Sequence, residues 1–346
     1  MSSPQKPSAY AQAGVDIDAQ EKGLARVKKL AKSTFTPGVL TEIGSFGGLF
    51  RPDLSGMTEP VLVASADGVG TKLMVARMME DYSSVGRDLV NHCVNDILVQ
   101  GAEPLFFMDY LGAGVLDPQK MVELVGGVAD GCRENGCALL GGETAEMPDF
   151  YSPGEYDIAG FIVGLSTEHD RPGRHRVRAG DALIGLAANG FHTNGYTLLR
   201  RILFEQMELT AISAYPGARH SVVDELLRVH KTYLKSVLPM IRDGSVNALA
   251  HITGGGIADN LERVIPDGLQ ARINTGAWEL PNTFAAIMEH GVDREEMFAT
   301  FNMGVGMILV VDAAKRADVL ARARTAGEAA FELGTIASGG PRVVLT

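Results

Sequence analysis

Apolar residues follow two different spacings in the first half of the chain. Short apolar runs, each bounded by Gly, Pro or Asp, predict strands at residues 61–66, 105–110, 138–140 and 158–165. Between these runs, apolar residues return every three or four positions, which predicts two helices. The two apolar stripes are Val85, Leu89, Cys93 and Ile97, and Met121, Leu124, Val125, Val128 and Cys132. Asp117 followed by Pro118 supplies an N-cap and a first-turn proline for the second helix.

The same alternation continues in the second half of the chain. Apolar runs predict strands at residues 182–187 and 305–311, and further strands close the chain. Helices are predicted near residues 196–204, 222–241, 278–290 and 313–326. Alternating strands and helices are typical of α/β or α+β domains, and this pattern leaves the strand order open.

A charged segment rich in Pro and Gly, at residues 168–180, interrupts this alternation. The 346 residues exceed the size at which a single hydrophobic core usually stops growing. We therefore expect two domains, an N-terminal one at residues 21–170 that opens with a short charged helix at 21–32, and a C-terminal one at 180–346. Residues 1–20 are polar and lack apolar periodicity, which predicts a flexible arm.

Composition narrows the classes of function. The net charge is −11 and no basic block is present, which argues against a nucleic-acid partner but leaves room for a local pocket for a phosphorylated metabolite. The three cysteines are odd in number and lack CxxC spacing, so a disulfide framework or zinc site is not expected. The first residues have no apolar signal region, and no stretch reaches the roughly 18 apolar residues of a membrane span. We expect a cytoplasmic protein with no membrane partner.

Residues 67–72 form the first candidate site, directly after a predicted strand. Gly68 and Gly70 let backbone N–H groups face an anion, and Lys72 adds a positive charge. Asp67 offers the oxygen ligand that Mg²⁺ prefers. The spacing fits neither a Walker A motif nor a dinucleotide fingerprint, and a simple tight turn is the alternative interpretation.

A second candidate is a polar stripe on the first predicted helix. Its members are Asp88, Asn91, His92, Asn95 and Asp96. Asp88, His92 and Asp96 are four residues apart and therefore share one face. A solvated helix face is the alternative, but such faces usually carry Lys and Glu. Asn95 and Asp96 could join Asp67 around a metal ion.

Three further glycine-containing turns carry polar residues. Glu143 and Glu146 follow a double glycine at a strand end, and a turn with solvated acids is the alternative. Residues 190–196 precede a predicted helix whose N-terminus suits a phosphate. His192 in that turn could transfer a proton near neutral pH, or serve only as a hydrogen-bonding spacer. Residues 251–256, with three consecutive glycines, suit a second anion-binding loop or the close packing of two domains. No GxSxG elbow, HExxH pair or nucleophilic Cys is evident.

Seven segments in this order resemble the phosphoribosylformylglycinamidine cyclo-ligase (AIR synthetase) family. They are AGVDIDA at 13–19, DGVGTK at 67–72, CVNDILVQGAEPLFFMDY at 93–110, GGETAEMP at 141–148, GFHTNGY at 190–196, HITGGG at 251–256 and FNMGVGM at 301–307. They cover nearly the whole chain, and their combination is specific to this family within a superfamily of ATP-dependent enzymes.

The resemblance implies a homodimer whose N-terminal domains together form a β-barrel, each followed by an α/β C-terminal domain. It implies ATP, Mg²⁺ and formylglycinamidine ribonucleotide as ligands. The implied reaction activates the formyl oxygen with the γ-phosphate and then closes the imidazole ring of aminoimidazole ribonucleotide, in purine biosynthesis.

The resemblance also implies roles for individual residues. Asp67 and Asp96 are expected to hold Mg²⁺, and His192, Lys72 and Glu143 to take part in catalysis. The residues expected to bind nucleotide are Asp16, Asp18, Gly68, Gly70, Thr71, Lys72 and Asn95, with the arm folding over it. The residues expected to bind substrate are Glu146, Thr193, Asn194, Gly254, Gly255 and Gly256.

Two other classes of function are compatible with the same motifs, another ATP-dependent enzyme of the superfamily and a non-catalytic scaffold. A small-molecule kinase of the superfamily would leave the phosphate on its product. A selenide-type enzyme would want a reactive Cys in its arm, and this arm has none. A non-catalytic, nucleotide-responsive scaffold would bind ATP without releasing phosphate.

Overall fold

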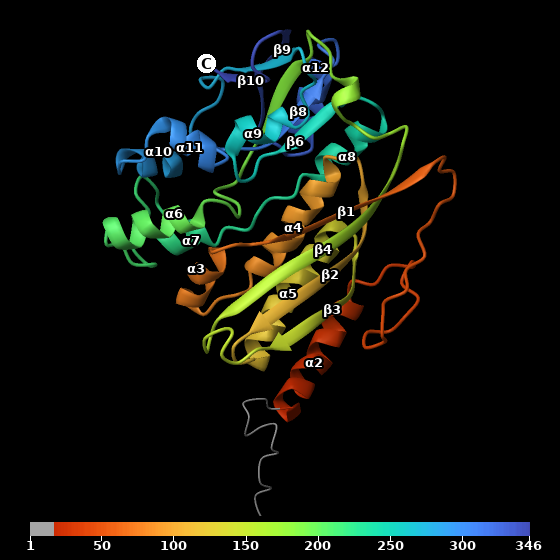
Figure 1. The fold of residues 1–346 in the computed structure, drawn as a ribbon, viewed down its shortest axis with the longest axis vertical. Coiled ribbons are helices and arrows are strands. Elements are labelled where there is room, and N and C mark those ends of the chain that lie inside the picture. Colours follow the sequence, from red (N-terminus) through yellow and green to blue (C-terminus); the bar gives the residue numbers. More distant parts are fainter. Residues whose placement is uncertain (1–16) are drawn as a thin grey trace, which may run out of the picture.

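We describe the fold from a computed structural model, whose backbone is described from Ile17 to Thr346 and whose side chains are described from Gly23 onward. The predictions for Asp16 and for the rest of the arm up to that residue lie outside the described residues, as does the side chain of Asp18. The two halves of the chain form two sheets, one below the other in Figure 1.

The first half contains a four-stranded sheet in the order β1-β4-β2-β3. Its strands are β1 (Pro60–Gly68), β2 (Glu103–Ala113), β3 (Ala138–Glu146) and β4 (Tyr156–Thr167). β4 pairs antiparallel with β1 and β2, whereas β2 and β3 are parallel because a helix connects them. The helices of this half are α2 (Ile17–Lys32), α3 (Lys72–Met79), α4 (Val85–Leu98) and α5 (Pro118–Asn135).

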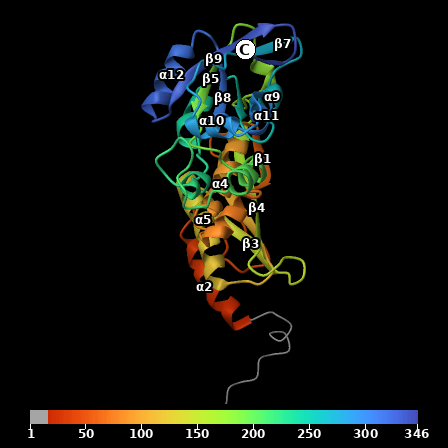
Figure 2. The same cartoon turned by 90° about the vertical axis from the view of Figure 1, so that its left-hand side faces the viewer.

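In the described part of the chain, helices cover one face of this sheet. α2, α4 and α5 pack on the same side, as Figure 2 shows edge-on. The apolar stripes predicted for α4 and α5 form the core between them, which confirms the two helices. The predicted N-cap is also confirmed, because Asp117 accepts hydrogen bonds from the first turn of α5. On the opposite face Leu62, Met108 and Phe161 remain exposed.

The second half contains a six-stranded mixed sheet in the order β10-β7-β9-β5-β8-β6. Its strands are β5 (Ala182–Ala187), β6 (Ala248–His251), β7 (Leu269–Ile273), β8 (Val305–Val311), β9 (Ala330–Ser338) and β10 (Val343–Leu345). Its longer helices are α8 (Leu234–Arg242), α10 (Asn282–Glu289) and α12 (Arg316–Thr325), and shorter ones are α6 (Tyr196–Arg200), α7 (Val222–Leu226), α9 (Gly256–Glu262) and α11 (Arg294–Thr300). The mixed α/β character predicted for both halves is confirmed.

Some predicted element bounds were wrong. The single helix predicted at 222–241 is two helices, α7 and α8, separated by residues 227–233. The backbone of this segment bonds to side chains of α4 instead of to a helix of its own, as described below. The helix predicted at 278–290 begins only at Asn282, after Pro281. The helix α2 already begins at Ile17, so residues 17–20, expected in the arm, are helical.

No described helix combines the length and the apolar composition that crossing a bilayer requires. Cys93, Cys132 and Cys137 are free thiols, and all three are buried. Burial raises the pKa of the Cys93 and Cys132 thiols well above the ordinary value, which makes them poor nucleophiles.

Glycines allow α4 and α5 to approach closely. A Cβ at Gly86 of α4 would lie 2.3 Å from the carbonyl oxygen of Leu124 and 2.5 Å from the amide nitrogen of Val128. Gly127 of α5 faces the same contact, where a Cβ would lie 2.7 Å from the carbonyl oxygen of Ser83. The backbone itself blocks these positions, so a side chain can enter only if the helices separate. This helix pair positions the polar stripe of α4.

We predict that Gly86→Ala lowers the free energy of unfolding by about 1–3 kcal/mol, because the methyl group forces the helices apart. Gly126→Ala in α5 is the matched control, since a Cβ there would meet only Leu30, at 3.9 Å. The control should be neutral or stabilising by up to about 1 kcal/mol. Urea unfolding of both variants measures the difference, and equal stabilities would contradict the close helix contact.

Candidate functional site

The polar stripe of α4 is buried against the segment at 227–233. The carboxylate Oδ1 of Asp88 accepts a hydrogen bond from the backbone N–H of His230 at 2.6 Å. Asn91 donates to the carbonyl of His230 at 2.8 Å. Asn95 donates to the carbonyl of Lys231 at 2.8 Å and accepts from the N–H of Tyr233 at 3.0 Å. The stripe is therefore the junction between the two halves, and the alternative of a solvated face is wrong.

Further along the stripe, carboxylates and imidazoles from five segments meet. Nε2 of His92 lies 2.7 Å from Oδ2 of Asp67, at the end of β1. Nδ1 of His92 lies 2.8 Å from the hydroxyl of Thr193. Asp96 lies 2.8 Å from Nδ1 of His251, at the end of β6. We call these residues, with His192 and His230, the junction cluster.

The charges of the junction cluster are divided between its rim and its interior. Burial opposes a charge on His92, but the hydrogen bond to Asp67 and the charge of Asp96 outweigh it, so the pKa of the ring is raised. Burial likewise opposes the charges of Asp67 and Asp96, yet hydrogen bonds from His92 and His251 lower the pKa of the two carboxyl groups. Both carboxylates remain partly exposed, at 42% and 28% of their side chains. The rim therefore presents ionised oxygens to a ligand.

The interior of the junction cluster is neutral. Burial lowers the pKa of His251, and lowers the pKa of His192 and His230 well below the ordinary value. The rings of His192 and His230 are stacked, with centroids 4.0 Å apart. These rings are therefore uncharged near pH 7 and can donate or accept a hydrogen bond.

The turn at 190–196 holds buried polar atoms that have no partner. They are both ring nitrogens of His192, Nδ2 of Asn194 and, just before the turn, Oδ1 of Asn189. A buried polar atom without a hydrogen bond costs about 1–3 kcal/mol, so a concentration of them is typical of a site that a ligand completes. His192 also adopts a left-handed backbone conformation, with φ of 58°, which is uncommon outside functional turns.

The glycine turn at 254–256 lies against this polar turn. A Cβ at Gly254 would lie 3.3 Å from Oδ1 of Asn194, so the two predicted ligand-binding turns adjoin. The other two glycines have packing roles. A Cβ at Gly255 would lie 2.7 Å from Asp259, and one at Gly256 would lie 1.8 Å from the carbonyl of Phe298. Both contacts lie within the second half of the chain, so they do not show the close packing of two domains, and Gly254 alone faces the polar turn.

The turn at 67–72 adjoins the same region, but Lys72 does not face outward. The hydroxyl of Thr71 lies 3.0 Å from that of Thr197. A Cβ at Gly70 would make only a loose contact with the carbonyl oxygen of Thr193. Gly68 donates its N–H to Asp67 at 2.7 Å. Lys72 instead begins α3 and is completely buried, with Nζ 2.8 Å from Oδ2 of Asp88. In this structure the ammonium group of Lys72 is therefore not positioned to make the predicted contact with a triphosphate.

Glu143 and Glu146 lie away from the junction cluster. Both belong to β3, whereas Asp67 ends β1 at the opposite edge of the four-stranded sheet. Three strand intervals of about 4.8 Å separate the two edges. Glu146 accepts a hydrogen bond from the N–H of Leu116 at 2.8 Å. Within one chain, the structure does not bring these glutamates to the other predicted site residues.

Glu143 instead lines a separate cavity of about 410 Å³ between α2, the glycine-containing loop at 42–48 and the central parts of β2 and β3. Lys28 and Asp109 line the same cavity. Gly142 makes room for Asp109, since a Cβ there would lie 2.1 Å from its Oδ1. Burial raises the pKa of Asp109 to about 7.

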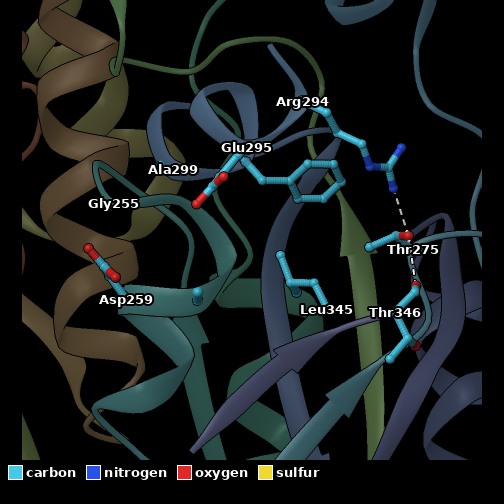
Figure 3. A pocket seen from close by; sticks show the side chains of 10 residues that line it. Gly255, Asp259, Thr275, Arg294, Glu295, Ala299, Leu345 and Thr346 are labelled. Atoms are coloured by element: carbon cyan, nitrogen blue, oxygen red, sulfur yellow. Dashed lines mark hydrogen bonds between the residues drawn. The ribbon is translucent and has the colours of Figure 1, made fainter. Parts of the chain in front are cut away.

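Another cavity, of about 510 Å³, lies between α9, α11 and β10 (Figure 3). Figure 3 shows Arg294 turned toward Thr275, to which it donates a hydrogen bond at 2.7 Å. Among the described residues, none that line this cavity has a buried polar atom without a partner. In this respect it differs from the turn at 190–196, and we do not include it in the candidate site.

Sequence reasoning missed two residues of the site and one carboxyl group. His230 lies in a segment predicted to be helical, where periodicity gives no sign of a buried turn. His251 is the first residue of the predicted loop at 251–256 but was given no role of its own, and its position after a strand could have identified it. Asp109 follows an apolar run and was read only as part of a strand.

Comparison with known proteins places these features in a family. The family profile of the N-terminal domain of AIR synthase related proteins matches residues 53–166, and that of the C-terminal domain matches residues 178–345. A phosphoribosylformylglycinamidine cyclo-ligase from Trichlorobacter lovleyi is 49% identical over 335 residues, which are 96% of each chain.

Solved structures share the fold at low sequence identity. The thiamine-monophosphate kinase from Stenotrophomonas maltophilia has a TM-score of 0.69 and 16% identity, and the match covers 94% of each chain. The hydrogenase maturation protein HypE in complex with ATP has a TM-score of 0.63 and 18% identity, covering 91% of this chain and 88% of that one.

The raised pKa of Asp109 predicts a pH-dependent stability. An unfolded carboxyl group ionises near pH 4, whereas folded Asp109 ionises near pH 7. The contribution of the neutral Asp109 side chain to the free energy of unfolding is therefore fully present below about pH 4 and is lost as the pH rises through about 7. Asn stays neutral throughout. Asp109→Asn should therefore gain stability relative to the parent protein between about pH 5 and about pH 8, measured as melting temperature.

Asp53→Asn is the control for this series, because hydrogen bonds from Ser55 lower the pKa of Asp53 instead of raising it. This control should show no gain as the pH rises. A constant difference between Asp109→Asn and the parent protein over the whole range would contradict the raised pKa.

Proposed function

This chain belongs to the phosphoribosylformylglycinamidine cyclo-ligase family, and we propose that it uses ATP to close formylglycinamidine ribonucleotide to 5-aminoimidazole ribonucleotide in purine biosynthesis. The observation that carries the proposal is the junction cluster. Ionised carboxylates at its rim adjoin buried polar atoms that lack partners, and a phosphorylated substrate with a metal–nucleotide needs both. The enzyme class is that of its relatives, one of which is 49% identical over nearly the full length.

The proposed reaction explains the need for ATP. Direct ring closure would have to expel hydroxide or water from a resonance-stabilised formamide. In the proposed mechanism the formyl oxygen attacks the γ-phosphorus, and the bond to ADP breaks. The amidine nitrogen then attacks the formyl carbon, the C–O bond breaks with release of phosphate, and the nitrogen loses a proton. Transfer of the phosphoryl group turns the oxygen into a good leaving group.

Asp67 and Asp96 are the proposed ligands of Mg²⁺. Both are ionised and partly exposed, and carboxylate oxygens are the ligands that Mg²⁺ prefers. When bound, Mg²⁺ would neutralise phosphate charge. The protein holds each carboxylate by an imidazole, His92 for Asp67 and His251 for Asp96. Such hydrogen bonds fix the direction of the oxygen lone pairs.

The turn at 190–196 is the proposed substrate side. His192, Thr193 and Asn194 present the polar atoms, and Gly254 leaves space in front of Asn194. Both ring nitrogens of His192 lack a partner, so one of them is available to take the proton that the attacking nitrogen loses, although burial, which lowers the pKa of the ring, makes it a weak base. A His192→Ala variant with near-normal kcat would remove this role.

The nucleotide phosphates are proposed to lie at the turn formed by Gly68, Gly70 and Thr71, near Asn95 and the two aspartates. The predicted covering of nucleotide by the arm with Asp16 and Asp18 remains part of the proposal. Glu143 does not reach the junction cluster within one chain. Its proposed catalytic role, and a substrate contact by Glu146, therefore require a second subunit. We also propose a cytoplasmic location.

The uncovered face of the four-stranded sheet supports a homodimer. Leu62 is 66% exposed and Phe161 is 52% exposed, and Phe161 pairs across strands with the exposed Met108. An apolar sheet face of this kind is typical of a protein interface. Two such sheets meeting face to face would give the β-barrel that we propose across the dimer.

We predict that the purified protein converts formylglycinamidine ribonucleotide, ATP and Mg²⁺ to aminoimidazole ribonucleotide, ADP and phosphate in equal amounts, measured by chromatography and mass spectrometry. Asp67→Asn and Asp96→Asn should each lower kcat/KM on the order of 10²-fold, a typical effect of removing one charge-stabilising group. Both variants should also need more Mg²⁺ for half-maximal rate.

Asp318→Asn on the outer helix α12 is the control for this experiment and should keep the parent activity. A product that retains the phosphate would indicate a kinase and contradict ring closure. Binding of ATP with no phosphate release in the presence of substrate would instead indicate a scaffold.

We predict that the protein sediments as a dimer and that the double variant Leu62→Glu/Phe161→Glu sediments as a monomer, because four charges would have to be buried in the interface. Analytical ultracentrifugation measures the mass. Ile212→Glu is the control, since Ile212 is equally apolar and 78% exposed but belongs to the second half. A monomeric parent protein, or an unchanged dimer of the double variant, would refute the proposed interface.

A further inference from the structure

The ammonium group of Lys72 is enclosed by protein and pairs with one carboxylate and two backbone carbonyl groups. Its ammonium group has three donors, and three protein acceptors surround it. Nζ lies 2.8 Å from Oδ2 of Asp88, 2.7 Å from the carbonyl oxygen of Arg228 and 3.3 Å from the carbonyl oxygen of His192. The side chains of Lys72 and Asp88 are both fully buried. A phosphate could reach this ammonium only if the junction opened.

The two carbonyl groups that Lys72 holds belong to the two segments that carry the stacked imidazoles. One is the carbonyl of His192 itself, whose backbone is in the left-handed conformation. The other belongs to Arg228, two residues before His230. The remaining oxygen of Asp88 accepts the N–H of His230 at 2.6 Å. The ion pair therefore fixes the backbone on both sides of the stack of His192 on His230.

Lys72 also connects this arrangement to the proposed phosphate turn. It directly follows Thr71 and is the first residue of α3. Its ammonium lies 5.6 Å from the ring centre of Tyr196, at the other end of the polar turn. A single side chain thus touches the start of α3, the α4 stripe, the turn at 190–196 and the segment at 227–233. No other position in the motif at 67–72 makes contacts of this kind in the described residues.

We propose that Lys72 is a positioning residue, which with Asp88 holds His192 and His230 in place for ring closure and does not contact ATP. The part of this inference that concerns the rate of ring closure rests on the proposed function. Its structural part concerns the imidazole rings and ATP affinity, and both can be measured whether or not ring closure occurs.

The test compares Lys72→Met with the double variant Lys72→Met/Asp88→Leu. The single variant leaves a buried carboxylate without a partner and is prone to unfold, whereas an apolar pair of similar volume removes that charge. Three quantities are measured for the double variant: kcat for ring closure, the Kd of MgATP by calorimetry, and the side-chain ¹⁵N signals of His192 and His230.

If Lys72 positions the two segments, kcat should fall at least about tenfold, as expected when reacting groups are displaced. The Kd of MgATP should stay within about threefold, because no phosphate contact is lost. The ring signals of His192 and His230 should shift. Asp67→Asn serves as the contrasting variant, with weakened MgATP binding and unshifted His230 signals.

An increase of about tenfold or more in the Kd of MgATP, with unshifted ring signals, would overturn the inference. Lys72 would then be a nucleotide-binding residue. Normal kcat together with unshifted ring signals would overturn it as well. If the parent protein binds MgATP but closes no ring, the proposed function fails. The ring signals and the Kd would then still decide the role of Lys72.

Discussion

The burial of the polar stripe of α4 is the constraint from which the rest of the site follows. Asp88, Asn91 and Asn95 lie on the inner face of a helix and would each lose hydrogen bonds to water on folding. Hydrogen bonds to backbone groups of residues 230–233, from the second half, replace these lost bonds to water. These bonds keep the segment out of a helix, and they bring His230 under the turn at 190–196. One set of satisfied polar groups therefore fixes the position of both halves.

The junction that results separates two kinds of polar environment over a short distance. Asp67 and Asp96 are ionised at the rim, where water and ligands reach them. His192 and His230 are neutral in the interior, where burial disfavours a charge. A metal–phosphate group suits the first environment, and the formyl and amidine groups of the proposed substrate suit the second. The division of charge thus matches the two tasks of the proposed reaction, phosphoryl transfer and ring closure.

The sequence predicted the elements on which the site is built and the turns that converge there. The stripe of α4 was visible because helical spacing places Asp88, His92 and Asp96 on one face. Asp67 and His192 were recognisable because each lies in a glycine turn after a strand. The helix predicted at 222–241 was wrong because periodicity is a local signal, and it cannot show that α4 competes for the backbone of that segment.

The same limit applies to Lys72 and Glu143. A lysine after a glycine turn fits a phosphate contact locally, but its burial depends on Asp88 and on a segment more than 150 residues away. The position of Glu143 at the far edge of the sheet depends on strand order, which an alternating pattern does not contain.

A crystal structure with a non-hydrolysable ATP analogue, Mg²⁺ and formylglycinamidine ribonucleotide tests this account of the junction most directly. The account predicts metal bound by Asp67 and Asp96, and substrate in contact with His192 and Asn194 in front of Gly254. Metal ligands at other residues, with the substrate bound away from the turn at 190–196, would contradict it.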